Sequence, residues 1–201
     1  MKKKVFLILS VICTSFSYAQ EVNEEKKLNN FSIITKGKLG FSELKIDDYG
    51  SINGFYTAFE LLAASKLSDK YSLEYGFGFS EFKANNVSQS NTGNVKNENF
   101  YIPVNLLRSV NFTGNNTFQI GVGLYGDYLY KSKIDGLLEE ENIGFTMGLN
   151  FQVGAKFKIA EKTFFRVMIE AQSDLTNLKK KAVEFRQINT NTISLSFIHG
   201  F

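Results

Sequence analysis

Histidine, cysteine and closely spaced carboxylates carry most enzyme chemistry, and this sequence has few of them. Its one histidine is His199 and its one cysteine is Cys13. Without a second histidine, neither a zinc site nor a Ser–His–Asp triad is expected, and His199 reads instead as a residue at a membrane interface. A carboxylate pair remains conceivable, but Glu60, Glu74 and Glu170 lie in three separate segments. We therefore predict no catalytic residues, no metal site and no cofactor.

The N-terminus carries the marks of a secretory signal peptide. Three lysines at positions 2–4 precede a short apolar run at 5–13, and Ser17-Tyr18-Ala19 forms a small-x-small cleavage signature. Cleavage after Ala19 would remove Cys13 and three of the 23 basic residues, leaving 20 to balance the 20 acidic ones. The apparent basicity thus belongs to the leader, which gives no reason to expect nucleic acid as a partner.

The rest of the chain is dominated by alternation with a period of two. Every second residue from Ile143 to Phe157 is apolar, while glycine, amides, threonine and one lysine stand between them. Such a period predicts β-strands with one apolar and one polar face. Eight stretches show it: 31–41, 55–67, 71–79, 100–106, 118–127, 143–157, 165–171 and 193–201.

Charges within these stretches fall on the polar face alone. They include Lys36, Lys38, Glu60, Glu74, Asp127, Lys156, Arg166 and Glu170. A lysine or arginine facing lipid at mid-bilayer costs about 2–4 kcal/mol, so a face without charge is what lipid exposure demands. A soluble lipocalin-like barrel is the alternative, and it would place apolar residues inside and charges outside. We interpret the apolar face as lipid-facing and the charges as a network inside a narrow lumen.

These features predict an all-β fold, an eight-stranded antiparallel up-and-down transmembrane β-barrel. Residues 1–19 are assigned to the signal peptide, 20–30 to a short periplasmic N-terminal segment and 31–201 to the barrel. Short links are expected at 68–70, 111–116 and 160–162, and long external links at 43–53, 83–98, 132–141 and 173–189. Both termini would then be periplasmic.

Two stretches fit this pattern less simply. Pro103, the only proline, lies inside a predicted strand of a barrel without free edges, so a bulge or a strand-end position is expected there. Residues 59–67 could also form a short helix, because Phe-Glu-Leu-Leu-Ala-Ala lacks strong β-formers. Tryptophan is absent, so Tyr71, Tyr128 and Tyr130 are candidates for the aromatic girdles.

The signal peptide, the hairpin rhythm, the run Tyr101-Ile102-Pro103-Val104 and the alternating C-terminus carry a family resemblance. The chain resembles the small bacterial outer-membrane β-barrels labelled porin-like or PorT-like, and it is similar in plan to the OmpA-type transmembrane barrel. The resemblance implies a bacterial outer-membrane location. It also implies that the C-terminal pattern acts as a signal for the barrel-assembly machinery; its residues are Ile193, Leu195, Phe197 and Phe201.

Three roles follow from the pattern. The lumen charges could form an ion-paired plug, or they could line a polar path for small solutes. The external loops could instead contact polysaccharide, a host surface or a protein partner, and Lys179-Lys180-Lys181 could contact lipopolysaccharide or simply be solvated. We expect a monomeric outer-membrane protein with a structural or interaction role and a side-chain-filled lumen. Its expected partners are outer-membrane lipids, lipopolysaccharide, the assembly machinery and a protein not yet identified. A narrow porin-like channel, or an accessory component of a secretion or uptake assembly, is the alternative.

Overall fold

The computed structural model describes residues 31–46, 50–85, 94–114, 116–135, 138–180 and 183–201. The predicted signal peptide and the 20–30 segment lie outside the described residues. None of the described residues forms a helix long and apolar enough to cross a bilayer.

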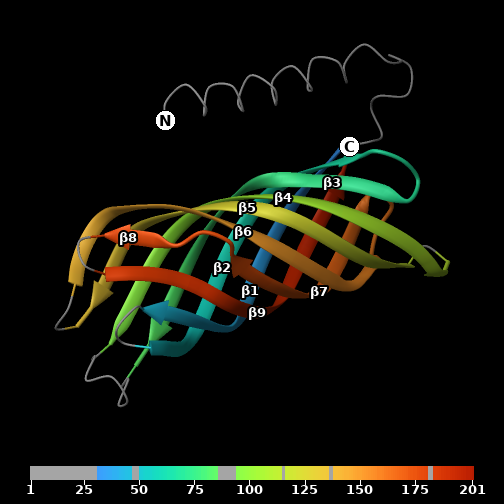
Figure 1. The fold of residues 1–201 in the computed structure, drawn as a ribbon. Helices are drawn as coiled ribbons and strands as arrows, with labels where there is room; N and C mark the ends of the chain where they lie inside the picture. Colours follow the sequence, from blue (N-terminus) through green and yellow to red (C-terminus); the bar gives the residue numbers. More distant parts are fainter. Residues whose placement is uncertain (1–30, 47–49, 86–93, 115, 136–137, 181–182) are drawn as a thin grey trace, which may run out of the picture.

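The described chain is built from antiparallel strands that close into a ring (Figure 1). Their bounds are β1 (Phe31–Ile46), β2 (Gly50–Lys66), β3 (Tyr71–Ala84), β4 (Val95–Thr113), β5 (Asn116–Ile134), β6 (Leu138–Lys158), β7 (Thr163–Asp174), β8 (Leu178–Lys180) and β9 (Val183–Gly200). Each strand from β1 to β6 pairs with the next one in sequence, β7 pairs with β9, and β9 pairs with β1. The three-residue β8 pairs only with the start of β9, so eight strands form the ring and the predicted barrel is confirmed.

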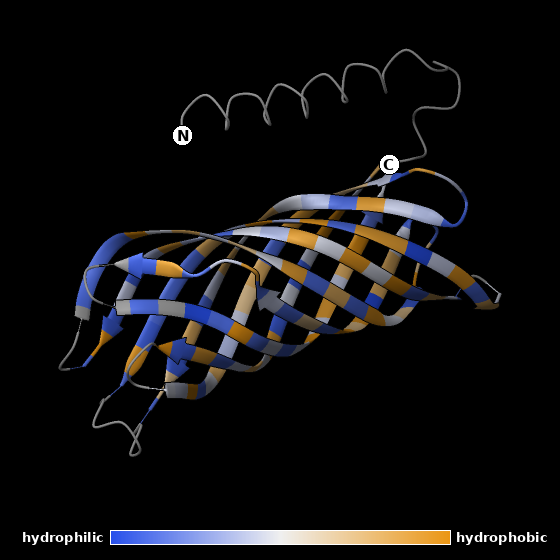
Figure 2. Cartoon of the chain, viewed as in Figure 1, coloured by the Kyte–Doolittle hydropathy of each residue, from blue (hydrophilic) through white to orange (hydrophobic). Residues whose placement is uncertain are grey.

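The middle of the barrel has an apolar outer face and a polar interior. Phe41 and Ile169 are 71% and 62% exposed, whereas Lys36 and Glu60 are at most 1% exposed. The alternation can be followed along the strands as bands of opposite colour (Figure 2). Residues 59–67 belong largely to β2 and show this alternation, so the helical alternative is wrong: ladders on both sides of β2 outweigh the weak local propensity.

The strands run further than predicted at the end of the barrel opposite Phe31 and Phe201. Residue pairs such as Lys83 with Lys96 and Lys133 with Glu139 continue the ladders. The prediction of long links at 43–53, 83–98, 132–141 and 173–189 is therefore wrong, because much of each link is strand. We call this end the outer end, and the end where Phe31 lies beside Phe201 the inner end.

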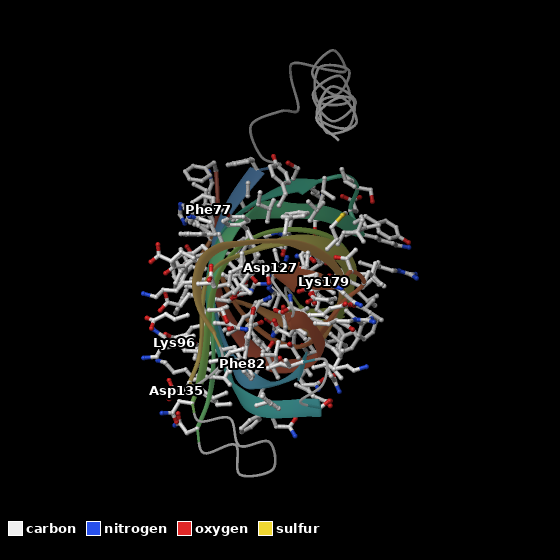
Figure 3. All side chains as sticks on the ribbon, turned by 60° about the vertical axis from the view of Figure 1, so that its left-hand side comes forward. Phe77, Phe82, Lys96, Asp127, Asp135 and Lys179 are labelled. Atoms are coloured by element: carbon white, nitrogen blue, oxygen red, sulfur yellow. The ribbon has the colours of Figure 1, made fainter. Side chains whose placement is uncertain are left out.

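Polarity reverses at the outer end. Apolar side chains now point inward, and they form one buried cluster of Leu44, Ile46, Ile52, Phe82, Ala84, Val95, Leu129, Ile134, Ile143 and Leu178. Phe82 lies inside the ring with Asp127, while Lys96 projects from the wall (Figure 3). We call these ten residues the outer apolar cluster.

Pro103 lies inside β4 and interrupts one ladder only. Its neighbours Tyr101 and Val104 pair with Gly78 and Tyr75 of β3, but Ile102 and Pro103 have no β3 partner. On the other side Pro103 faces Tyr125 of β5 in unbroken register. The missing N–H is therefore accommodated by a gap in the β3–β4 pairing, and not by a bulge or a strand end as predicted.

Candidate functional site: the lumen

Two lysines of β1 and two glutamates form a closed ring of ion pairs across the lumen. Lys36 and Lys38 share the inward face of β1 because they are two residues apart. Lys36 Nζ lies 2.7 Å from Glu60 and 3.1 Å from Glu170, and Lys38 Nζ lies 2.5 Å and 2.8 Å from the same two carboxylates. All four side chains are fully buried. We call them the central ion-pair ring.

Further contacts hold the carboxylates of this ring in place. The Tyr101 hydroxyl donates a hydrogen bond to Glu60, and Ser194 Oγ donates one to Glu170 at 2.6 Å. The Lys38 ammonium also lies 5.5 Å from the centre of the Tyr101 ring. Burying charges is less costly when each charge has a partner, and all four charges of this ring are ion-paired while both carboxylates also accept a hydrogen bond.

A second ion pair crosses the lumen between β7 and β3. Both terminal nitrogens of Arg166 donate to the carboxylate of Glu74, at 2.5 Å and 3.1 Å. This two-pronged geometry is the strongest form of an arginine–carboxylate contact. Together with the central ion-pair ring, it brings together six of the eight charges predicted to share the lumen.

Asp127 and Lys156 face inward but stand apart from these pairs. Asp127 accepts a hydrogen bond of 2.6 Å from Asn99, and the Lys156 ammonium lies 4.8 Å from the ring centre of Phe164. Within the described residues neither forms an ion pair. Asp127 is level with Thr146, ten residues before Lys156 on β6, which is roughly 33 Å of strand. The prediction that all eight lumen charges pair is therefore wrong for these two residues, because they lie at opposite ends of the barrel.

The outer wall carries charges where the membrane belt ends. Phe79, Phe100 and Tyr130 form an aromatic cluster with ring centres 5.0–6.0 Å apart. Just beyond it, Lys96 bridges Glu81, at 2.9 Å, and Glu98. Tyr130 is thus part of an aromatic cluster at the outer membrane boundary, where an aromatic girdle was predicted.

Hydrogen bonds shift the titration of these outer charges. Those from Lys96 and Tyr130 hold the pKa of Glu98 below its ordinary value of 4.5. The hydrogen bonds from Lys96 to Glu98 and Glu81 raise the pKa of Lys96. A lowered carboxyl pKa stabilises the fold above pH 4.5, and this contribution is lost as the pH falls through the lowered value.

His199 lies on the lipid-facing side near the inner end. Its Nδ1 is 3.1 Å from the Thr163 hydroxyl, and its ring meets Phe201 edge-on at 5.3 Å. Within the described part of the chain, no group of three or more histidine, cysteine or acidic side chains could hold a metal ion. The residues of the predicted assembly signal share this face, with exposed fractions of 49–58%: Ile193, Leu195, Phe197 and Phe201.

The predicted lysine run falls at the β8–β9 hairpin. Lys179 is exposed and pairs in register with Glu184. Lys181 lies outside the described residues, so the question of lipopolysaccharide contact stays with the prediction.

The sequence reasoning missed the outer apolar cluster. Its signal was present, since Leu44-Lys45-Ile46 and Phe82-Lys83-Ala84 continue the alternation with charge on the outer face. Their polar composition instead predicts loops at 43–53 and 83–98.

Comparison with known proteins identifies the family of this chain. The sequence profile of the family described as "Outer membrane protein beta-barrel domain" matches residues 6–201. The chain belongs to this family. Its location is therefore the outer membrane, and the fold and general resemblance predicted from sequence are confirmed, while the narrower PorT-like resemblance stays a prediction.

Solved structures were also compared with the chain. Neisserial surface protein A has 14% identity and a TM-score of 0.52, and the match covers 85% of this chain and 97% of that one. OprG from Pseudomonas aeruginosa has 13% identity and a TM-score of 0.48, covering 87% and 97%. Ail of Yersinia pestis has 12% identity and a TM-score of 0.40, covering 85% and 99%. No curated protein sequence matched the chain. At these identities the first comparison supports the fold alone.

Proposed function

We propose that this outer-membrane barrel is closed to solutes and has a structural or interaction role without catalysis. The observation that carries the proposal is that two different fillings lie in series along the lumen. The central ion-pair ring joins β1, β2 and β7 through fully buried side chains. The outer apolar cluster fills the interior beyond it.

The two fillings would stop different solutes. An ion passing the central ion-pair ring would have to separate contacts of 2.5–3.1 Å between buried charges, which is strongly unfavourable. At the outer end, a polar solute would also have to shed water among aliphatic and aromatic side chains. The arrangement supports a plug more strongly than a path, as expected for an eight-stranded barrel whose interior just accommodates side chains.

Planar-bilayer recording of the full mature protein tests this proposal. We expect no steady conductance above that of the protein-free membrane, with folding and insertion verified by far-ultraviolet circular dichroism of the same sample. A stable open level of fixed size would refute the plug and favour the narrow porin-like channel. A stoichiometric partner captured by cross-linking in native membranes would favour an accessory role in an assembly.

We further propose that the inner end, with both chain termini, faces the periplasm. The short turns at 67–70 and 159–162 lie at this end, as is typical of outer-membrane barrels. Because the chain has no cysteine after Cys13, single cysteines report orientation without background. Asp135→Cys should react with a membrane-impermeant maleimide on intact cells and Ser68→Cys should not; the reverse labelling would contradict this orientation.

A further inference from the structure

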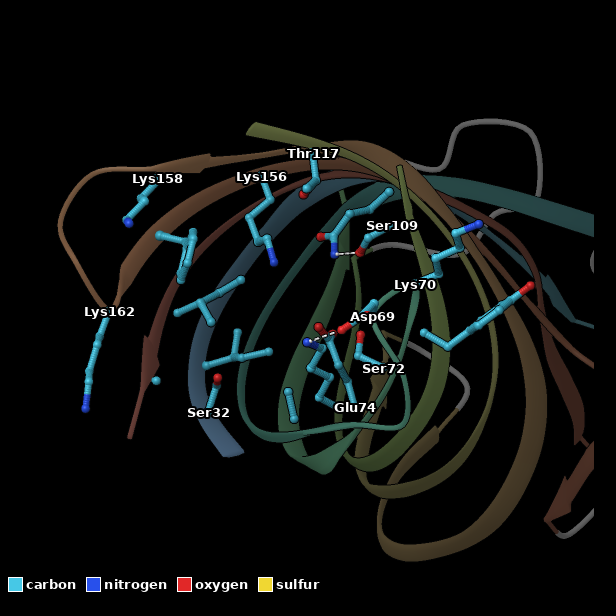
Figure 4. Close-up of a pocket in the computed structure, with 18 of the residues that line it drawn as sticks. Ser32, Asp69, Lys70, Ser72, Glu74, Ser109, Thr117, Lys156, Lys158 and Lys162 are labelled. Atoms are coloured by element: carbon cyan, nitrogen blue, oxygen red, sulfur yellow. Dashed lines mark hydrogen bonds and ion pairs between the residues drawn. The ribbon is translucent and has the colours of Figure 1, made fainter. Parts of the chain in front are cut away.

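The inner end of the lumen opens into a cavity of about 550 Å³ (Figure 4). This volume falls in the range of pockets that bind small molecules. Glu74, held by Arg166, lies at its depth, and the turns after β2, β4 and β6 surround its mouth. None of its lining residues belongs to the central ion-pair ring or the outer apolar cluster. We call it the inner cavity.

One wall of the inner cavity is apolar. Ile34 and Ile198 are buried against Leu62, and Ala64 and Phe164 pack against them from the cavity side. These residues come from β1, β2, β7 and β9, which adjoin one another in the ring. An inward apolar wall beside an open mouth offers a surface for the hydrocarbon part of a ligand.

The facing wall is polar and has unused hydrogen-bonding groups. Gln119 is 2% exposed and its amide donates to Ser109 at 2.8 Å, but its carbonyl oxygen has no partner within the described residues. The hydroxyl of Thr117, 9% exposed, also lacks a partner there. A hydroxyl can donate to an anionic ligand oxygen, and the free carbonyl can accept from a protonated one.

The charge balance of the cavity lining favours an anion. Its five lysines outnumber its three acidic residues, and Glu74 is already bound by Arg166 while Asp69 pairs with Lys66 at 2.8 Å. The least exposed of these lysines is Lys156, which is half-buried and has no ion pair within the described chain. Its ammonium lies over Phe164, at the junction of the polar and the apolar wall.

We propose that the inner cavity binds a small amphipathic anion. Its phosphate or carboxylate would contact Lys156 and the Thr117 hydroxyl, and its aromatic or short aliphatic body would lie against Phe164, Ile34 and Ile198. Because the central ion-pair ring closes the lumen beyond the cavity, the ligand enters and leaves by the same mouth. The inner cavity is therefore a binding site and not part of a route across the membrane.

Calorimetric titration of phenyl phosphate tests this site, using the mature full-length protein in phosphatidylcholine nanodiscs. We expect saturable binding at one site, weakened at least tenfold by Lys156→Gln and preserved by Lys156→Arg. Lys133→Gln is the matched control, because it removes the same charge from an exposed lysine at the outer end. Inorganic phosphate, which lacks the ring, and benzyl alcohol, which lacks the charge, should each bind at least tenfold more weakly. Benzoate in place of phenyl phosphate distinguishes a carboxylate site from a phosphate site.

Three results would overturn the inference. They are no saturable binding of phenyl phosphate or benzoate to the wild type, equal weakening by Lys156→Gln and Lys133→Gln, and equally tight binding of benzylamine. Conductance is recorded without any of these compounds, so an open pore would refute the closed barrel without deciding whether the inner cavity binds an anion.

Discussion

Strand β3 has opposite polarity in its two halves. In the middle of the barrel Phe77 and Phe79 point outward while Glu74 is buried inside. Two residues beyond Phe79, the outward positions become Glu81 and Lys83, and the inward ones become Phe82 and Ala84. The strand continues without a break, and the inward and outward positions keep the same phase throughout.

The difference between these halves separates two kinds of information. A period of two in the sequence shows that a segment is a strand of the barrel wall, whereas the residue types on each face show whether that face contacts lipid, water or the packed interior. Outward residues contact lipid in the middle and water at the outer end, so the apolar set moves from outside to inside. The same change occurs on β4, where Lys96 and Glu98 precede Phe100 and Ile102 on the outward face. The outer end is thus packed like a soluble barrel attached to a membrane barrel.

The largest effect is expected from breaking the central ion-pair ring. Glu170→Gln would leave two buried lysines with one carboxylate, which should lower the free energy of unfolding by about 3–5 kcal/mol. The measurement is urea unfolding from phosphatidylcholine vesicles, followed by circular dichroism. Glu161→Gln, at an exposed turn residue, is the control and should change the value by less than about 0.5 kcal/mol. Equal stability of the two variants would show that the ring is not buried as described.

A cavity in the outer apolar cluster should cost somewhat less. Ile134 is 1% exposed, so Ile134→Ala should lower the free energy of unfolding by about 2–5 kcal/mol in the same assay. Ile169→Ala removes the same atoms from a lipid-facing side chain, where lipid tails can fill the space, and should cost less. If Ile169→Ala were the more damaging, the outer end would not be packed like a soluble core.

Lysine substitutions at outward-facing positions locate the boundary between lipid and water along the barrel wall. Val122→Lys, in the membrane belt, should cost about 2–4 kcal/mol. Asn53→Lys, on the outward face beside Ile52 of the outer apolar cluster, should be close to neutral since it meets water. The ratio of folded to unfolded protein on unheated gels gives a second measure of both. A similar cost at the two positions would place Asn53 within the membrane.

Much of the fold could be predicted from local pattern. A period of two identifies the strands and the face of most residues, so the sequence alone predicts that Lys36, Glu60 and Arg166 lie inside. Ile143 is an exception: it shares the predicted lipid-facing set with Phe145 but is buried in the outer apolar cluster. Strand ends were less accurate, because charged outward residues such as Lys83 and Lys133 look the same in a loop and in a strand that has left the membrane.

Which inward charges form ion pairs depends on the register between strands and on the closure of the barrel. The alternation of residue types along one strand contains neither. Lys36 meets Glu170 although 134 residues separate them, and it does so because β9 closes against both β1 and β7. Arg166 likewise selects Glu74 from across the lumen, while Lys156 and Asp127 stay apart at opposite ends.

The amino-acid order alone set the strands, their faces and the membrane belt, because each follows from residues two positions apart. The plug and the inner cavity arose only when the ring closed, since their walls combine side chains from distant strands whose depth depends on the stagger between neighbours.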